Sequence, residues 1–167
     1  MARQTGLNTV TARLYSIYGP YEDPSRLLPT LLILGFRGAL PPLVSPTTAR
    51  DFVYVDDAVD ALLALARRSS RPGAVYNLCT GAQTTLASVV ETARRLLGVA
   101  VEPVWSGMER RSWDTDIWVG SPEAMEKEIG WRSKIDFATG LQRMIDWFQG
   151  HPKVLEYYTS RVQSLVR

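Results

Sequence analysis

Short runs rich in β-branched and aromatic residues alternate with amphipathic segments along most of the 167-residue chain. Each strand-like run ends at glycine, proline or polar residues; the runs are 9–18, 51–55, 74–79 and 99–105. The helix-like segments are 27–36, 56–68, 84–97, 121–129 and 137–150, and the tail 154–167 has the composition for one more helix. Strands that alternate with helices predict an α/β fold with some parallel pairing.

The ends and faces of these elements are also predicted. Asp56 or Asp57 is expected to cap the second helix, whose apolar residues fall at helical spacing and are Val59, Leu62, Leu63 and Ala66. Thr84 or Thr85 is expected to cap the next helix, and Gly98 to end it. The run 74–79 is apolar throughout, which is typical of a strand covered on both faces.

Composition excludes several classes of site. With one cysteine and one histidine the chain has no internal disulfide and no zinc-ligand cluster. Cys79 lies in an apolar run and is interpreted as a small buried residue, and His151 in a Gly-His-Pro turn as a surface residue. The net charge is only +2, and no basic stripe with interleaved aromatic residues occurs, so nucleic-acid binding is not expected.

The length suits one domain over residues 1–167, with 151–167 as its terminal helix or tail. The N-terminal residues do not read as a signal peptide, and the apolar stretches are shorter than a membrane span. A cytoplasmic protein is therefore the expectation.

A series of short motifs follows in chain order: Ala-Arg-Leu-Tyr-Ser-Ile-Tyr-Gly-Pro at 12–20, Leu-Pro at 28–29, Arg-Asp-Phe-Val-Tyr-Val-Asp-Asp at 50–57, Tyr-Asn-Leu at 76–78, Arg-Ser-Trp-Asp at 111–114 and Ile-Gly-Trp at 129–131. This series resembles the extended short-chain dehydrogenase/reductase family, the NAD-dependent epimerases and dehydratases of nucleotide sugars. The resemblance runs from about Gly6 to Phe148 and implies the carboxyl-terminal, substrate-binding part of a Rossmann-type epimerase fold.

Two motifs of the family's NAD-binding half are missing from these residues. No Gly-x-Gly occurs, so there is no dinucleotide fingerprint, and no tyrosine is followed four residues later by lysine. The resemblance implies that the full-length family uses NAD(P), but that this chain alone binds no cofactor and carries no catalytic residue. We expect the chain to lack the cofactor-binding half.

The resemblance also implies a set of ligand-binding residues. Arg50 corresponds to an arginine that contacts the nucleotide diphosphate; the alternative is a surface arginine paired with Asp51 or Asp57. Arg111 and Asp114 correspond to a phosphate-binding arginine and an acid that accepts from ribose hydroxyls. The alternative is a solvated charged loop, and a slip of one residue would substitute Arg110 for Arg111.

Further positions complete the expected site. The loop 40–44, with Pro41 and Leu43, is expected to flank the base, and Leu28 to line the same pocket. Ser16 stands where the family often has asparagine, so its contact with the sugar diphosphate is expected to be lost or water-mediated. Cofactor contacts would come from Tyr18, Gly19 and Pro20, and only with a complete Rossmann half; the alternative is a turn that ends a strand.

Three functions follow as hypotheses: a substrate-binding part that needs the missing half for catalysis, a stand-alone nucleotide-binding module, or a protein-interaction module without activity. The strands at 9–18 and 74–79 would belong to the parallel sheet of the intact fold, and without their neighbours they leave unpaired edges. A homodimer or a complex with a separate Rossmann half is therefore expected.

Overall fold

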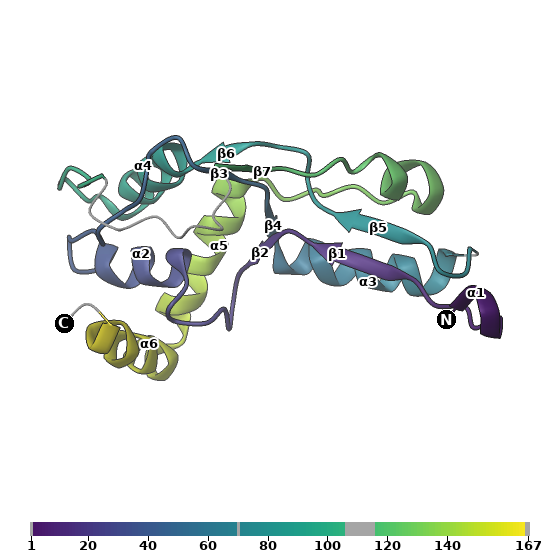
Figure 1. Cartoon of the computed structure of the whole chain (residues 1–167). Helices are drawn as coiled ribbons and strands as arrows, with labels where there is room; N and C mark the ends of the chain where they lie inside the picture. The colour runs from purple at the N-terminus through teal and green to yellow at the C-terminus, as the bar shows by residue number, and fades with distance from the viewer. Residues whose placement is uncertain (1, 70, 106–115, 166–167) are drawn as a thin grey trace.

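In the computed structural model the described residues are 2–69, 71–105 and 116–165, and they confirm the predicted mixed α/β class (Figure 1). The helices are α1 (Ala2–Thr5), α2 (Leu27–Gly35), α3 (Val55–Arg68), α4 (Leu86–Leu97), the π-helical turn η1 (Met125–Ile129), α5 (Phe137–Gly150) and α6 (Pro152–Leu165). The strands are β1 (Thr11–Leu14), β2 (Ser16–Tyr18), β3 (Ala49–Arg50), β4 (Phe52–Tyr54), β5 (Val75–Leu78), β6 (Thr84–Thr85) and β7 (Ile117–Trp118).

The first predicted strand is two strands with different partners. β1 pairs in parallel with β5, and β2 pairs in parallel with β4. The change of partner occurs at Tyr15, whose N–H donates to Leu78 O, while the N–H of Ser16 donates to Asp51 O. The chain thus crosses from one parallel pair to the other within two residues, and residues 9–18 are not one continuous strand.

A third sheet has the order β6-β3-β7 and brings the segment of Arg50 against the start of α4. β3 runs antiparallel to β6 and parallel to β7. The prediction of a strand at 99–105 is wrong. This segment forms only an isolated bridge between Leu43 and Trp105, because no neighbouring strand offers it a continuous ladder.

Helix α3 departs from its prediction in two ways. Its first residue is Val55 and no side chain caps it, because the carboxylate of Asp57 is buried and accepts hydrogen bonds from residues 133–135 instead. The buried face is Asp57, Ala58, Ala61 and Leu65. The expected apolar face points outward, and Val59, Leu62 and Leu63 are 50%, 45% and 46% exposed.

Helix α1 is not among the predicted helices, and the helix predicted at 121–129 is mainly the π-helical turn η1; helices α2, α4, α5 and α6 lie where the sequence predicts them. The hydroxyl of Thr85 caps α4 by accepting from the N–H of Ser88, and Gly98 ends that helix in the left-handed conformation, with φ of 68°. The π-helical turn ends at Gly130 in the same way, with φ of 70°. Helix α5 buries a face formed by Gly140, Leu141, Met144, Ile145 and Phe148, and the tail forms α6.

The interior consists of two hydrophobic clusters. One is shared by α2, α4, α5 and α6 and includes Tyr18, Leu28 and Phe148; the other lies between α3, β4, β5 and η1 and includes Val53, Tyr76 and Trp131. Figure 1 shows β1, β5 and α3 extending together to one side, away from the group of helices α2, α4, α5 and α6.

The prediction that strand β5 is covered on both faces is wrong. Tyr76 and Leu78 are buried, but Val75 is 42% exposed. Cys79 is fully buried, as predicted, and burial together with the nearby Asp51 raises the pKa of its thiol to about 12. His151 is exposed, as predicted.

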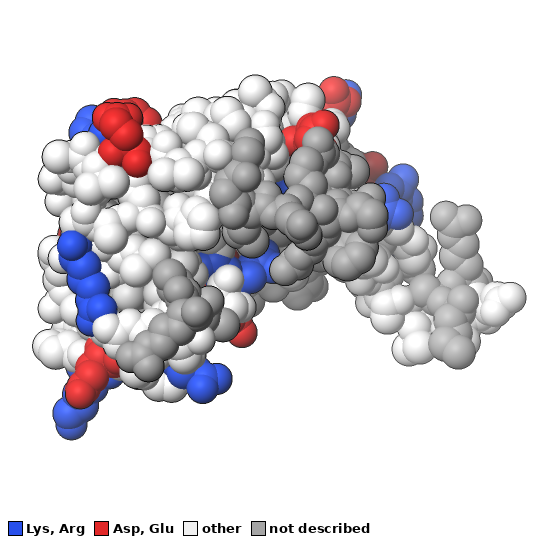
Figure 2. Space-filling model, turned by 60° about the vertical axis from the view of Figure 1, so that its left-hand side comes forward, with Lys and Arg blue, Asp and Glu red and all other residues white. Residues whose placement is uncertain are grey.

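Charges on the surface are dispersed. On the face drawn in Figure 2, the described Lys, Arg, Asp and Glu side chains stand in small separate groups on a largely uncharged surface. Among the described residues no group of three His, Cys, Asp or Glu is placed to hold a metal ion. Within the same part of the chain, no helix has the length and apolar character to cross a membrane.

Candidate functional site

A cavity of about 470 Å³ lies between the β2–α2 loop, the loop before β3 and the start of α4. Four of the predicted binding residues line it: Ser16, Leu28, Leu43 and Arg50. They come from four separate segments of the chain. Pro41 does not line the cavity, but its neighbour Pro42 does. The remaining lining residues are Ile17, Glu22, Ser25, Arg26, Leu27, Val44, Thr48, Phe52 and Leu86.

The cavity combines apolar walls with a few polar groups. The apolar side is formed mainly by leucine, isoleucine, valine and phenylalanine side chains, and the polar side by two arginines, one glutamate and three hydroxyls. Small-molecule sites usually have this composition, in which apolar surface provides contact area and a few polar groups fix orientation. A flat ring can pack against the apolar side, and the arginines suit an anion.

Arg50 lies on β3, at the point where the three-stranded sheet meets the cavity. Its Nη1 donates to the carbonyl of Ala49 at 2.9 Å. The carboxylates of Asp51 and Asp57, which are the alternative partners of Arg50, are buried and accept bonds from other groups. Its side chain remains a cavity residue, suitable for a phosphate oxygen.

Asp51, the residue after Arg50, is a buried anchor that sequence reasoning did not single out. One oxygen accepts from the N–H and the hydroxyl of Thr80, at 2.8 and 2.7 Å. The other oxygen accepts from the N–H groups of Gly81 and Gly120, at 2.9 and 3.3 Å. These bonds tie the ends of β3, β5 and β7 together beside the cavity. An acid within an apolar strand is the signal that could have revealed it.

Glu22 and Arg26 form the wall contributed by the β2–α2 loop, and sequence reasoning missed both. Nε of Arg26 lies 3.6 Å from Oε1 of Glu22. Burial raises the pKa of Glu22 from its ordinary 4.5 to about 7, against the lowering effect of Arg26. The hydroxyl of Tyr158 on α6 donates to the carbonyl of Glu22 at 2.6 Å and so fixes the loop. The spacing of four residues between Glu22 and Arg26 is the sequence signal that could have predicted their pairing.

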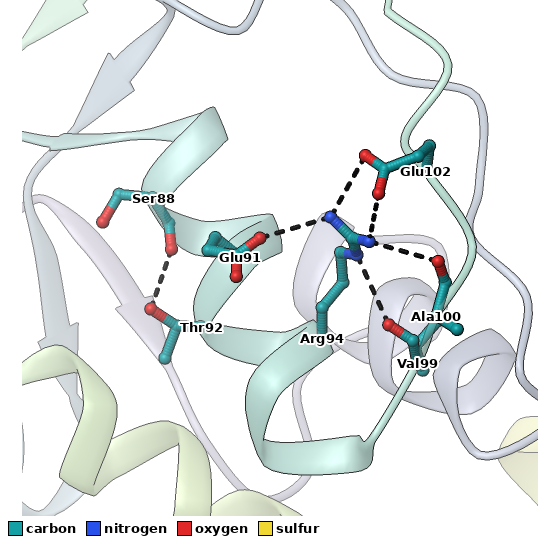
Figure 3. Close-up of polar contacts among 7 residues, drawn as sticks. All are labelled: Ser88, Glu91, Thr92, Arg94, Val99, Ala100 and Glu102. Atoms are coloured by element: carbon teal, nitrogen blue, oxygen red, sulfur yellow. Dashed lines mark hydrogen bonds and ion pairs between the residues drawn. The ribbon is translucent and has the colours of Figure 1, made fainter.

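Arg94 holds the segment that follows α4 (Figure 3). Its guanidinium donates to the carbonyls of Val99 and Ala100, at 3.4 and 3.2 Å, and to Glu102 at 2.7 Å. Further along, the N–H of Leu43 donates to the carbonyl of Val104 at 3.2 Å. One arginine on α4 thereby fixes the segment that supports a wall of the cavity.

Tyr18, Gly19 and Pro20 do not face the cavity. The ring of Tyr18 is 2% exposed and packs on Phe52, Tyr54 and Phe137, and its hydroxyl donates to Phe137 O. Burial raises the pKa of Tyr18 above its ordinary value. Their contact with a cofactor stays a prediction that depends on a Rossmann half.

The remaining two predicted site residues, Arg111 and Asp114, lie outside the described residues. The described neighbours Trp105 and Asp116 mark the two ends of this segment. Trp105 bridges to Leu43 in the cavity wall, and the carbonyl of Asp116 accepts from the N–H of Ala49 next to Arg50. Both ends of the segment therefore lie close to the cavity.

Known proteins of one family are similar to this chain in sequence and structure. Residues 1–79 match the model of the NAD dependent epimerase/dehydratase family. Over longer alignments the chain is also similar to individual enzymes with this type of activity in their names. It is 29% identical over 151 residues to a dTDP-glucose 4,6-dehydratase of Streptomyces antibioticus, and the alignment covers 88% of this chain and 44% of the relative. The resemblance predicted from the motifs is confirmed.

Solved structures of family members agree. A UDP-glucose 4-epimerase of Thermotoga maritima, determined with UDP-glucose, matches with a TM-score of 0.80 and 26% identity over 89% of this chain and 48% of its own. The Bordetella bronchiseptica enzyme WbmF, determined with NAD⁺, matches with a TM-score of 0.80 and 28% identity over 98% of this chain and 52% of its own. The predicted fold class is thereby confirmed: the chain has the fold of about half of a Rossmann-type epimerase.

The chain spans only part of the length of its relatives. It covers 22% of a trifunctional UDP-glucose 4,6-dehydratase, epimerase and reductase of Arabidopsis thaliana, 44% of the Streptomyces antibioticus dehydratase and about half of the two epimerase-like structures. The activities of the whole relatives therefore do not transfer directly to this chain.

Proposed function

We propose that this chain is the nucleotide-sugar-binding portion of an NAD-dependent sugar epimerase or dehydratase and that it is not catalytic by itself. The observation that carries the proposal is the convergence of Ser16, Leu28, Leu43 and Arg50 on one cavity. The family resemblance names these residues from motifs alone, without geometry, and they come from segments up to 34 residues apart (16 to 50).

The chemistry of the cavity supports the same assignment. A nucleotide diphosphate sugar combines a flat base, two phosphates and a polar sugar. Arg50 and Arg26 offer charge for the phosphates, and Leu43 and Pro42 offer apolar surface for the base. Arg111 and Asp114 are proposed to complete the site from the segment between Trp105 and Asp116.

Catalysis is proposed to require a Rossmann half that residues 1–167 do not supply. These residues contain neither a Gly-x-Gly nor a tyrosine followed four positions later by lysine. NAD(P) would be held by that half, and Tyr18, Gly19 and Pro20 would touch it only in the assembled fold. A titration of this chain with NAD is expected to give no heat of binding.

A partner is proposed to cover the side of the molecule formed by α3, β1 and β5. Leu62 and Leu63 on α3 are nearly half exposed, and Leu14 and Val75 in the strands are 54% and 42% exposed. A two-stranded pair is marginal alone, and its open edges favour addition of a neighbour. The partner is a Rossmann half or a second copy of the chain.

Titration calorimetry with UDP-glucose and dTDP-glucose tests the binding role. Arg50→Ala is expected to weaken binding at least tenfold, because a hydrogen bond to a charged group contributes about 1.5–3 kcal/mol. Arg95→Ala is the matched control, since Arg95 is exposed on α4 and does not line the cavity. Arg111→Ala tests the predicted phosphate residue outside the described part.

The alternative function is a protein-interaction module without nucleotide binding, which the exposed apolar side favours. Absence of binding by the unaltered chain, to either nucleotide sugar, would contradict the proposed function and support this alternative. Light scattering at micromolar concentration tests the partner proposal independently. A homodimer, or a stable complex when a Rossmann half is added, is expected; a monodisperse monomer that forms no such complex refutes it.

A further inference from the structure

Glu22 differs from the other polar residues of the cavity because one of its carboxylate oxygens has no partner. Its Oε2 is buried and makes no hydrogen bond, and the side chain as a whole is only 14% exposed. The other oxygen, Oε1, lies 3.6 Å from Nε of Arg26, which is longer than a good charge-assisted hydrogen bond. Burial of a carboxylate oxygen without a hydrogen bond destabilises the fold, and such atoms are rare in native proteins.

The surroundings of Glu22 favour its protonated form. Arg26 is the cation beside it, and its side chain is 63% exposed, so solvent screens its charge. Asp23, the next residue along the loop, adds negative charge, and Tyr158 contacts the carbonyl of Glu22 rather than its carboxylate. Burial therefore dominates and raises the pKa of the carboxyl to about 7.

The loop holds this carboxyl in place. The N–H of Glu22 donates to Gly19 O at 3.3 Å, and its carbonyl accepts from Tyr158 at 2.6 Å. Two backbone bonds, one to the turn after β2 and one to α6, fix the residue from both sides. Glu22 is thereby kept among the residues that line the cavity, together with Arg26 and Ser25.

We propose that Glu22 is a specificity-determining residue of this cavity, which in its protonated form hydrogen-bonds an uncharged hydroxyl of the ligand, and that binding of an anionic nucleotide sugar takes up one proton at this carboxyl. The inference rests on the proposed function. An ionised Glu22 would repel the diphosphate, and phosphate contact with Arg26 would remove the nearest cation from the carboxylate. Both effects favour the protonated carboxyl in the complex, with the proton drawn from solvent.

The test is titration calorimetry of the full chain with UDP-glucose and dTDP-glucose at pH 6, 7 and 8, in two buffers of different ionisation enthalpy. The diphosphate diester of these probes does not titrate in this range. If binding requires the protonated carboxyl, Kd rises about tenfold from pH 6 to pH 8, and proton uptake approaches one at pH 8. The two-buffer comparison counts the protons directly.

Three variants sharpen the measurement. Glu22→Gln mimics the protonated acid, so it is expected to bind equally at all three pH values without proton uptake. Arg26→Gln removes the cation that opposes protonation and is expected to move the midpoint of the profile to higher pH. His151→Gln is the control, because His151 is exposed and outside the cavity; it is expected to keep the profile of the unaltered chain.

The outcomes separate this inference from the proposed function. Binding by the unaltered chain with a flat profile and no proton uptake would overturn the role of Glu22 alone. That role is also refuted if Glu22→Gln keeps the full pH dependence, or if His151→Gln removes it. Absence of binding at every pH would overturn both proposals. If Glu22→Gln does not fold, proton counting on the unaltered chain and on Arg26→Gln still decides the question.

Discussion

Replacement of the two buried aspartates by asparagine is expected to give clearly different losses of stability. Asp51 and Asp57 are 0% and 2% exposed, and each accepts several hydrogen bonds. Asp51 uses both oxygens, with two donors on each. Asp57 uses Oδ2 alone, which accepts from the hydroxyl of Ser133 and from the N–H groups of Lys134 and Ile135, at 2.7–2.9 Å.

Asparagine has only one oxygen, and this decides the magnitude. In Asp57→Asn the carbonyl oxygen can take the place of Oδ2 and keep all three donors, so the loss is expected at about 1 kcal/mol from the missing charge. In Asp51→Asn the amide NH₂ must face at least one buried N–H of Thr80, Gly81 or Gly120. One or two donors left unsatisfied cost about 1–3 kcal/mol each, so a loss of about 3 kcal/mol is expected.

Urea unfolding followed by tryptophan fluorescence measures the free energy of unfolding of both variants. In a thermal unfolding experiment, the Tm of Asp51→Asn should fall by about 6–12 °C. Asp60→Asn is the control for the chemical change, since Asp60 is exposed on α3; it is expected within about 0.5 kcal/mol of the unaltered chain. Equal losses for Asp51→Asn and Asp57→Asn would refute the argument that the distribution of donors over the two oxygens controls the stability.

Two further predictions follow from the fold. The thiol of Cys79, with its pKa raised to about 12, should react with a disulfide reagent at pH 8 at least about 10³-fold more slowly in the native chain than in urea, and comparable rates would contradict its burial. Arg94→Met should lower the free energy of unfolding by about 1–2 kcal/mol and weaken nucleotide-sugar binding several-fold, through the segment that supports Leu43, whereas Arg95→Met should change neither.

Local signals in the sequence were sufficient to predict the ends of α4 and the buried faces of α4 and α5, which pack against other parts of this chain. The apolar spacing of α4 and α5 matches their buried faces, and Thr85 and Gly98 bound α4 as expected, because these choices depend on neighbours within a few residues. The same reasoning failed for α3. Its most apolar face is exposed, and its buried face holds Asp57, because the donors of residues 133–135 lie 76 or more positions away.

Site residues were predicted where they belong to a segment that resembles the family. Residues that reach the cavity only through the folding of the chain were not predicted. Ser16, Leu28, Leu43 and Arg50 were expected from resemblance, and they meet at the cavity. Glu22 and Arg26 were missed because their roles depend on burial by the fold, including the contact of α6 with the loop. The strand at 99–105 failed for a similar reason, since β-branched residues form a strand only beside a partner.

The two hydrophobic clusters differ in how completely the chain covers them. The cluster around α2, α4, α5 and α6 buries large side chains such as Leu28, Met144 and Phe148 completely, and the cavity lies on this side. The cluster under α3 buries Val53 and Leu78, but its outer elements expose Leu14, Leu62 and Val75. The exposed apolar surface lies on the side where we propose that a partner packs, and the proposed ligand site lies on the side whose cluster buries its large side chains.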